Sequence, residues 1–251
     1  SDKTVRIWDL ETAECVGEPL RSHRTSISAI KVMTHGSAPL LLTGSDSNTV
    51  TGSYMSNPAD IAVYLDDSDN NTIAGSTIAI TANYNNSPAL YLTAASRNTI
   101  SQSLIQNTLN DAVAFHAASN SNVISQSTLT ASGGSGGQIW LDGSSSNTVT
   151  ASYLYTNAGN GGVTVLGSSY NTFSLSTITS VNTTNAALDF QSGSFNSVSQ
   201  SRVTSLVSGV GVSMRIPASY NTIDRSTITS SGNTAMDIRG SSHTILDSYV
   251  Q

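Results

Sequence analysis

The chain has 251 residues, of which 10% are charged and 37% are hydrophobic, and its formal net charge is −6. Its charge density lies well below the roughly 25% of an average globular chain, while its apolar content exceeds that of disordered chains. No basic cluster points to nucleic acid, no apolar run approaches the roughly 20 residues of a membrane span, and the single Cys15 excludes a disulfide framework.

The N-terminal 31 residues differ in composition from the rest of the chain. They contain both Lys residues and every Glu, whereas the chain from residue 32 onward has only Arg and Asp as charged residues. We interpret this change as a sign that two segments are joined, and the repeat that begins at residue 45 places the boundary between them at residue 44.

The first segment resembles a WD-repeat propeller blade. Residues 2–15 read DKTVRIWDLETAEC, with Trp8-Asp9 in the place of the signature pair, and residues 40–50 read LLLTGSDSNTV, like the next strand and turn. The resemblance ends where Gly52 stands in place of the next Trp. About 50 residues are too few for a propeller, which needs four to eight blades.

Residues 1–44 are therefore expected to form a WD-repeat-derived cap rather than a propeller. Two stretches in this segment have strand-forming composition, namely Thr4–Ile7 and Leu40–Thr43. Because an open strand edge invites pairing, we expect these stretches to pair onto the first turn of the fold that follows.

From residue 45 onward the chain repeats a unit of about 24 residues nine times. Each unit begins with an Asn anchor, has an apolar residue two positions later, Ser five positions later and another apolar residue after that. The anchors are Asn48, Asn71, Asn98, Asn122, Asn147, Asn171, Asn196, Asn221 and, in the same slot, His243. Alternation with a period of two predicts two short strands per unit.

A third short strand follows in each of the first eight units. Its expected inward pairs are Val63/Leu65, Leu90/Leu92, Val113/Phe115, Ile139/Leu141, Val163/Val165, Leu188/Phe190, Val212/Met214 and Met236/Ile238. Three short strands per repeat predict one turn of a parallel solenoid. Residues 45–251 resemble the right-handed parallel β-helix family of secreted polysaccharide-active and surface proteins. The expected fold is all-β, with about nine turns.

Within each turn the anchor and the Ser should occupy bends. We expect the Asn amides to bond one another along the coil and the Asn backbone to adopt unusual dihedral angles. The Ser hydroxyl needs a partner at its corner. The acidic run DDSDNN at 66–71 is expected to be a turn rather than a calcium loop, and no metal or cofactor is expected.

Function is expected on the outward residues of the third strand, since the resembled family often binds sugar on this face. The candidate catalytic residues are Asp189 and Asp237, two turns and about 9.6 Å apart on ladder spacing. Glycoside hydrolysis needs two carboxylates either about 5 Å or about 6.5–9.5 Å apart, so this separation is marginal. The candidate substrate-binding residues are Tyr64, Tyr91, His116, Trp140, Asp142, Arg215 and Arg239.

Three functions remain open. The first is a non-catalytic scaffold, secreted or on the cell surface, that could bind polysaccharide through its aromatic residues. The second is a polysaccharide lyase or glycoside hydrolase, in which the arginines would bind uronate carboxylates. The third is ice binding by the outward pairs Thr128/Thr130, Thr177/Thr179 and Thr227/Thr229, a column that Tyr153, Tyr155 and Arg202 interrupt.

The last unit ends at Gln251 before any third strand. We expect this open edge to meet a continuation of the chain or a second copy.

Overall fold

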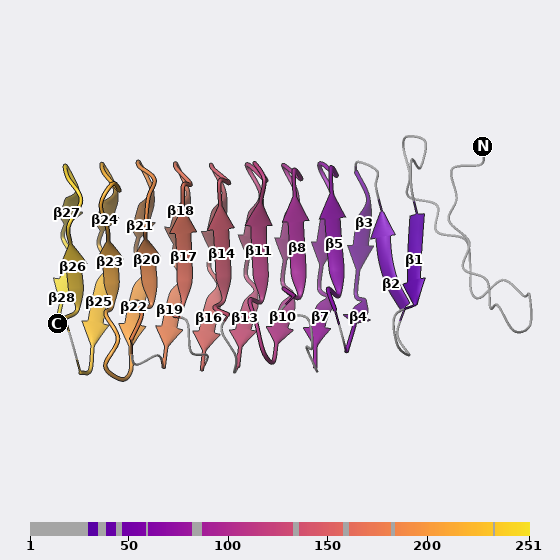
Figure 1. Cartoon of the computed structure of the whole chain (residues 1–251), viewed down its shortest axis with the longest axis horizontal. Coiled ribbons are helices and arrows are strands. Elements are labelled where there is room, and N and C mark those ends of the chain that lie inside the picture. Colours follow the sequence, from indigo (N-terminus) through magenta and orange to yellow (C-terminus); the bar gives the residue numbers. More distant parts are fainter. Residues whose placement is uncertain are drawn as a thin grey trace, which may run out of the picture.

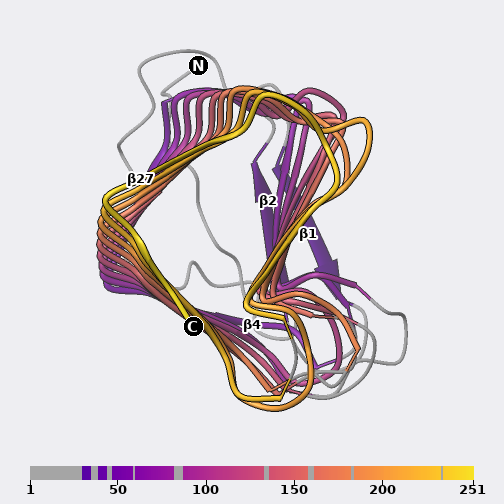
Figure 2. The ribbon, with the colours of Figure 1, turned by 90° about the vertical axis from the view of Figure 1, so that its left-hand side faces the viewer.

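The computed structural model describes residues 30–34, 39–43, 47–58, 60–81, 87–132, 136–157, 161–181, 184–232 and 234–251. Every regular element in these residues is a β-strand, and the strands stack into an elongated coil (Figure 1). The coil contains three sheets that run along its axis, and the strands of successive turns pair in parallel. Figure 2 looks along this axis and shows successive turns nearly superimposed.

The sheet formed by the first strand of each turn, here called the first-strand sheet, has nine strands. They are β3 (Thr49–Thr51), β6 (Thr72–Ala74), β9 (Thr99–Ser101), β12 (Val123–Ser125), β15 (Thr148–Thr150), β18 (Thr172–Ser174), β21 (Ser197–Ser199), β24 (Thr222–Asp224) and β27 (Thr244–Leu246).

The second-strand sheet also has nine strands. They are β4 (Tyr54–Ser56), β7 (Thr77–Ile80), β10 (Leu104–Asn107), β13 (Thr128–Ala131), β16 (Tyr153–Thr156), β19 (Thr177–Ser180), β22 (Arg202–Ser205), β25 (Thr227–Ser230) and β28 (Tyr249–Val250).

The third-strand sheet has ten strands and carries the candidate site. They are β1 (Ile30–Thr34), β2 (Pro39–Thr43), β5 (Val63–Asp66), β8 (Leu90–Thr93), β11 (Val113–His116), β14 (Ile139–Asp142), β17 (Val163–Leu166), β20 (Leu188–Phe190), β23 (Val212–Met214) and β26 (Met236–Ile238).

The strand order confirms the predicted parallel β-helix. Eight turns, from β3–β5 to β24–β26, contain all three strands, and β27 and β28 supply two strands of a ninth. Equivalent residues pair across neighbouring turns, as Leu129 does with Leu154, so each inward position forms a column. The self-association expected beside β26–β28 stays a prediction.

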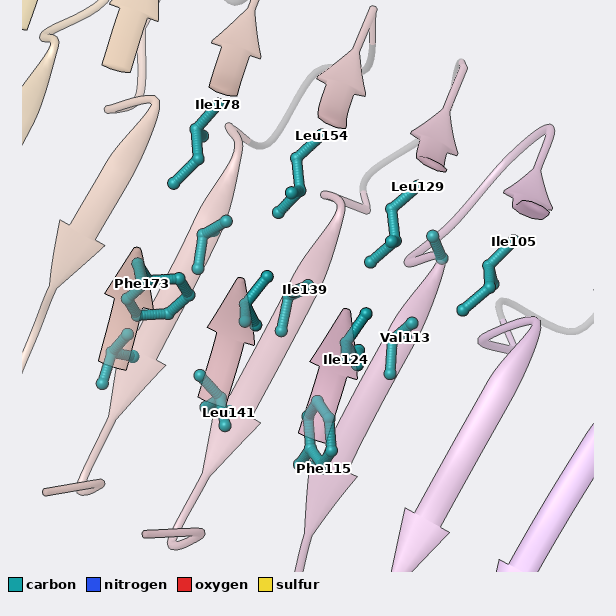
Figure 3. Close-up of a cluster of buried hydrophobic side chains, with 14 of the residues drawn as sticks. Ile105, Val113, Phe115, Ile124, Leu129, Ile139, Leu141, Leu154, Phe173 and Ile178 are labelled. Carbon is teal, nitrogen blue, oxygen red and sulfur yellow. The ribbon is translucent and has the colours of Figure 1, made fainter. Parts of the chain in front are cut away.

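The interior is a set of apolar columns, as the alternating pattern predicts. The inward side chains of the third strand are buried from Val63 to Met214, and Phe115, Phe173 and Phe190 are among the largest fully buried side chains. Figure 3 shows how the inward side chains of neighbouring turns line up behind one another. Ile238, in the last strand of its sheet, is 44% exposed.

The Asn anchors form the predicted hydrogen-bonded ladder. The Nδ2 of Asn48 donates to Oδ1 of Asn71 at 2.8 Å, and the Nδ2 of Asn71 donates to Oδ1 of Asn98 at 2.9 Å. Each anchor also accepts the backbone N–H of the anchor one turn earlier, for example Asn98 N to Asn122 Oδ1 at 2.8 Å. The ladder satisfies buried polar groups that would otherwise be costly.

The predicted position of the unusual backbone angles was wrong by one residue. Positive φ angles occur at the residue before each anchor, such as Arg97 (58°) and Tyr170 (60°), and at the residue before each corner Ser, such as Gln102 (49°). The anchor cannot take this role because its side chain must point inward to join the ladder. The residue before it faces solvent and makes the bend, which explains why these positions tolerate so many residue types.

The corner Ser residues find the partners that their burial requires. The Oγ of Ser76 donates to the carbonyl of Ala74 at 2.9 Å and accepts the backbone N–H of Ser53 at 3.1 Å. Equivalent pairs follow at later turns, for example between Ser103 N and Ser127 Oγ at 3.1 Å.

Two strands before residue 45 join the third-strand sheet. Strand β2 pairs in parallel with β5 through Leu42 and Tyr64, and β1 pairs antiparallel with β2. The strand expected at Leu40–Thr43 is therefore present and meets the first turn. The other expected strand, Thr4–Ile7, and the Trp8-Asp9 motif lie outside the described residues, so the WD-repeat origin of this segment and the boundary at 44 stay predictions.

Candidate functional site

The outer face of the third-strand sheet carries all the predicted site residues, but the structure divides them into two groups. Those of β5, β8, β11 and β14 surround a groove in the N-terminal half of the coil. Those of β20, β23 and β26 lie farther along and form ion pairs. Arg215 and Arg239 directly follow β23 and β26.

The groove has a volume of about 470 Å³ and runs over the outer face of β8, β11 and β14. Its lining residues are Ile61, Ser87, Pro88, Tyr91, Asn110, Asp111, Ala114, His116, Gly137, Trp140 and Thr164. Three of the predicted binding residues, Tyr91, His116 and Trp140, are among them. A concave surface that combines aromatic side chains with polar groups is typical of small-molecule and sugar sites.

The centre of the groove is a small residue between two large ones. Tyr91, Ala114 and Trp140 occupy the same register position on three neighbouring strands. Because each strand step is about 4.8 Å, the backbones of Tyr91 and Trp140 lie about 9.6 Å apart. Because the side chain of Ala114 is only a methyl group, a space remains above it between the two large residues.

Tyr64 supports Tyr91 from the side away from Ala114. The two rings stack with centroids 5.3 Å apart and an interplanar angle of 12°. Burial, followed by the nearby charge of Asp66, raises the pKa of Tyr64. Tyr64 is therefore placed to hold Tyr91 in its orientation, although Tyr64 does not line the groove itself.

His116 and Asp142 end the neighbouring strands β11 and β14, and their side chains contact each other. The Nε2 of His116 lies 3.0 Å from Oδ2 of Asp142, and both side chains are partly exposed. His116 also meets the Tyr91 ring at an angle, with ring centres 6.4 Å apart. Asp142 fixes the orientation of the imidazole through this contact.

Asp111 is a groove residue that the sequence patterns missed. It precedes β11, outside the alternating columns, and its Oδ1 accepts the backbone N–H of Gly137 at 2.6 Å. Within the described part of the chain no other hydrogen bond reaches this carboxylate. Burial raises the pKa of Asp111 to about 6, although the Gly137 N–H opposes the shift. A carboxyl with such a shift in a groove is a candidate functional group.

The C-terminal group contains the two candidate catalytic carboxylates. Asp189 and Asp237 face outward in the same register, with Ser213 between them, so their predicted two-turn separation is confirmed. Asp189 is not the solvated residue that an outward position suggests, because it is only 4% exposed. Arg215 and Gln191 cover it and bond to it.

Each of these carboxylates is paired with an arginine. Arg215 makes two contacts with Asp189, from Nε at 3.0 Å and from its second nitrogen at 2.7 Å. Burial raises the pKa of Asp189, and the Arg215 charge opposes that shift. Asp237 pairs with Arg239, two residues later in the same turn, at 3.1 and 2.8 Å, and this pair is more exposed. Both arginines are thus engaged by carboxylates of this chain, which leaves them poorly placed to bind a uronate.

The DDSDNN segment forms the predicted turn. Asp67 and Asn70 have positive φ angles, the Oγ of Ser68 donates to the Asp66 carbonyl at 2.7 Å, and Asp69 pairs with Arg97. Among the described residues no group of three or more His, Cys, Asp or Glu side chains could hold a metal ion. Nor does this part of the chain contain a helix that is long and apolar enough to cross a membrane.

The stacked parallel strands and the outward-facing groove define a parallel β-helix protein. A family model described as the right handed beta helix region matches residues 21–154, more than half of the chain, and the chain belongs to this family. A comparison with curated proteins found no match.

Solved structures of similar fold include two from polysaccharide enzymes. An alginate lyase from a Paenibacillus species is 11% identical, with 83% of this chain and 87% of that chain covered and a TM-score of 0.46. Endopolygalacturonase I from Stereum purpureum, complexed with two galacturonate, is 17% identical, with 81% and 66% covered and a TM-score of 0.35. Neither similarity bears on the activity of this chain.

Proposed function

We propose that this protein binds glycans, with the groove over β8, β11 and β14 as the binding surface. The observation that carries the proposal is the gap over Ala114 between Tyr91 and Trp140. Aromatic rings bury large apolar area at a small entropic cost, and sugar rings present flat faces that such rings can cover. The low charge of the chain fits a secreted or cell-surface role for this rod.

The polar groups of the groove supply orientation. Asp111 lies before β11 and His116 ends it, so the two side chains stand toward opposite ends of the aromatic gap. A carboxylate accepts hydrogen bonds from sugar hydroxyls, and an imidazole can donate or accept one. A pyranose over Ala114 would therefore find apolar contact at its faces and polar contact at its edges.

The test is a binding measurement with aromatic substitutions. Isothermal titration against a panel of hexasaccharides should find a ligand whose affinity falls roughly tenfold in Tyr91→Ala and in Trp140→Ala. The matched control is Tyr153→Ala, which removes a 45% exposed tyrosine from the second-strand sheet. Equal losses in all three variants, or none in the two groove variants, would remove this groove as the site.

The alternative of a polysaccharide lyase or glycoside hydrolase acting at Asp189 and Asp237 stays a prediction. If such an activity exists, the double variant Asp189→Asn/Asp237→Asn should abolish release of reducing ends from the substrate. Full activity in that variant would exclude these two residues as the catalytic pair.

A second candidate function, ice binding, gains one observation from the structure. The outward Thr pairs of the second-strand sheet are interrupted by Tyr153, Tyr155 and Arg202, as expected. The first-strand sheet is more regular. From β3 to β21 its outward positions carry no charge and are Thr49, Thr51, Thr72, Ala74, Thr99, Ser101, Val123, Ser125, Thr148, Thr150, Thr172, Ser174, Ser197 and Ser199.

Ordered hydroxyl and methyl groups at strand spacing could align water on this face. Thermal hysteresis that is present in the natural protein and lost in Thr148→Lys would support this function. Absence of hysteresis in the natural protein would exclude it.

A further inference from the structure

The charge of the groove indicates which glycans it accepts. The described residues that line it include neither Lys nor Arg, and His116, the one basic side chain among them, already contacts Asp142. The nearest candidate cation of the C-terminal group, Arg215, lies about 19 Å away along the coil, at four strand steps from His116, and is paired with Asp189. A negatively charged sugar would meet Asp111 without any compensating charge.

Among the described residues, no cation pairs with Asp111. Its carboxylate receives one backbone N–H, from Gly137, and it is ionised above about pH 6 because burial raises its pKa to about 6. A partly buried carboxylate without a cation is unfavourable. A ligand that brings a positive charge would remove this cost when it binds.

The groove also has the aromatic component of a cation site. The faces of Tyr and Trp rings attract cations electrostatically, and the attraction is strongest where water is excluded. Tyr91 and Trp140 stand on the two sides of Ala114, and Asp111 lines the same groove. A metal ion is a poorer occupant than an ammonium, because hard cations need several oxygen ligands and Asp111 is the one carboxylate among the lining residues.

Resting on the proposed glycan binding, we infer that the groove selects positively charged sugars: the ammonium group of an amino sugar pairs with Asp111 while its ring lies between Tyr91 and Trp140. A glucosamine unit carries the required ammonium. An N-acetylglucosamine unit of the same ring geometry does not, and it serves as the matched neutral ligand.

Among the described residues, four other titratable groups lie on the elements around Asp111. On the sheet they are His116, Asp142 and Tyr91. Near Ser87 the titratable group is Asp60, whose Oδ1 accepts a hydrogen bond from the Ser87 hydroxyl at 2.6 Å. The ammonium adds affinity only where Asp111 is ionised and the amine is protonated, so the gain should rise as the pH increases through about 6 and fall again as the amine loses its proton.

The experiment is titration calorimetry with glucosamine hexasaccharide, its N-acetylated counterpart and cellohexaose at about pH 7 and about pH 5. At the higher pH the glucosamine oligomer should bind roughly tenfold or more tightly than the other two, as a charge-assisted hydrogen bond implies. The preference should shrink at the lower pH. It should disappear in Asp111→Asn, whose amide still accepts the Gly137 N–H.

Asp224→Asn is the control for general electrostatic attraction, because it removes the same charge from the first-strand sheet. A preference that survives Asp111→Asn, or that falls equally in Asp224→Asn, overturns the inference. Equal binding of all three oligosaccharides, with loss in Trp140→Ala, overturns it while leaving glycan binding intact. Loss of the proposed function itself would appear as no binding of any oligosaccharide.

Discussion

Gly136 packs directly against the backbone nitrogen of Asp111. A Cβ atom at position 136 would stand 2.2 Å from that nitrogen and 2.2 Å from the carbonyl carbon of Asn110, far inside any permitted contact. The next residue, Gly137, supplies the N–H that holds the Asp111 carboxylate. Two adjacent glycines thus position the acidic side chain that lines the groove.

We therefore expect Gly136→Ala to displace Asp111. The overlap should cost about 1–3 kcal/mol in the free energy of unfolding, as for other overpacked sites, and it should weaken oligosaccharide binding. The control is Gly143→Ala, where a Cβ meets nothing within 4 Å and only the positive φ of 59° should cost stability, by about 1 kcal/mol. The equivalent turn positions already hold Ala94 and Ala117 at positive φ. Urea denaturation and calorimetry measure both effects, and unchanged binding in Gly136→Ala would contradict the assigned packing.

Asp111 should also make stability depend on pH. Its pKa is raised from 3.8 to about 6 in the folded state, so the folded state holds the proton more tightly than the unfolded state does. Stability from this residue is present at low pH and is lost as pH rises from about 4 through about 6. As the pH rises over this interval, the free energy of unfolding of Asp111→Asn should increase by about 1–2 kcal/mol relative to that of the natural protein, allowing for partial exposure. If the difference in free energy of unfolding between the two proteins stayed constant from about pH 4 to about pH 7, the raised pKa of Asp111 would be contradicted.

The Asp189–Arg215 pair should be sensitive to loss of one partner. Arg215→Met leaves a buried carboxylate, and the free energy of unfolding should fall by about 1–3 kcal/mol near neutral pH. The loss should shrink in acid, because protonation of Asp189 removes the unpaired charge. Asp189→Leu/Arg215→Met should recover most of the stability. Denaturation at two pH values checks this, and a double variant less stable than Arg215→Met would count against the explanation.

The apolar columns should carry most of the stability. Phe190→Ala or Ile178→Ala removes a fully buried side chain and should cost about 2–5 kcal/mol. Thr179→Ala, on the outer face of β19, should cost no more than about 0.5 kcal/mol. Chemical denaturation that gave similar costs for the inner and outer positions would mean that the register is wrong.

The repeat made the fold predictable from sequence. Asn anchors, corner Ser residues and alternating apolar residues recur so regularly that the inward columns, the Asn ladder and the outward faces all follow from them. The positive φ angles were predicted one residue too late. The residue that repeats in the sequence is the Asn anchor, whereas the bend occurs at the variable residue before it. Phe195, for example, adopts φ 60° there.

The candidate site was less predictable because its residues depart from the repeat. Tyr91, His116 and Trp140 could be found as outward positions, yet Asp111 lies in a connection whose length varies between turns. Its environment depends on glycines 25 and 26 residues later, which no periodic pattern connects to it. The burial of Asp189 likewise depends on Arg215, one turn away, covering it.

The most direct test of the glycan-binding groove is a crystal structure of the protein soaked with glucosamine hexasaccharide. We predict a sugar ring over Ala114, between Tyr91 and Trp140, with its amino nitrogen within hydrogen-bond distance of the Asp111 carboxylate. A sugar bound instead beside Arg215 and Arg239, or on the first-strand sheet, would contradict the account.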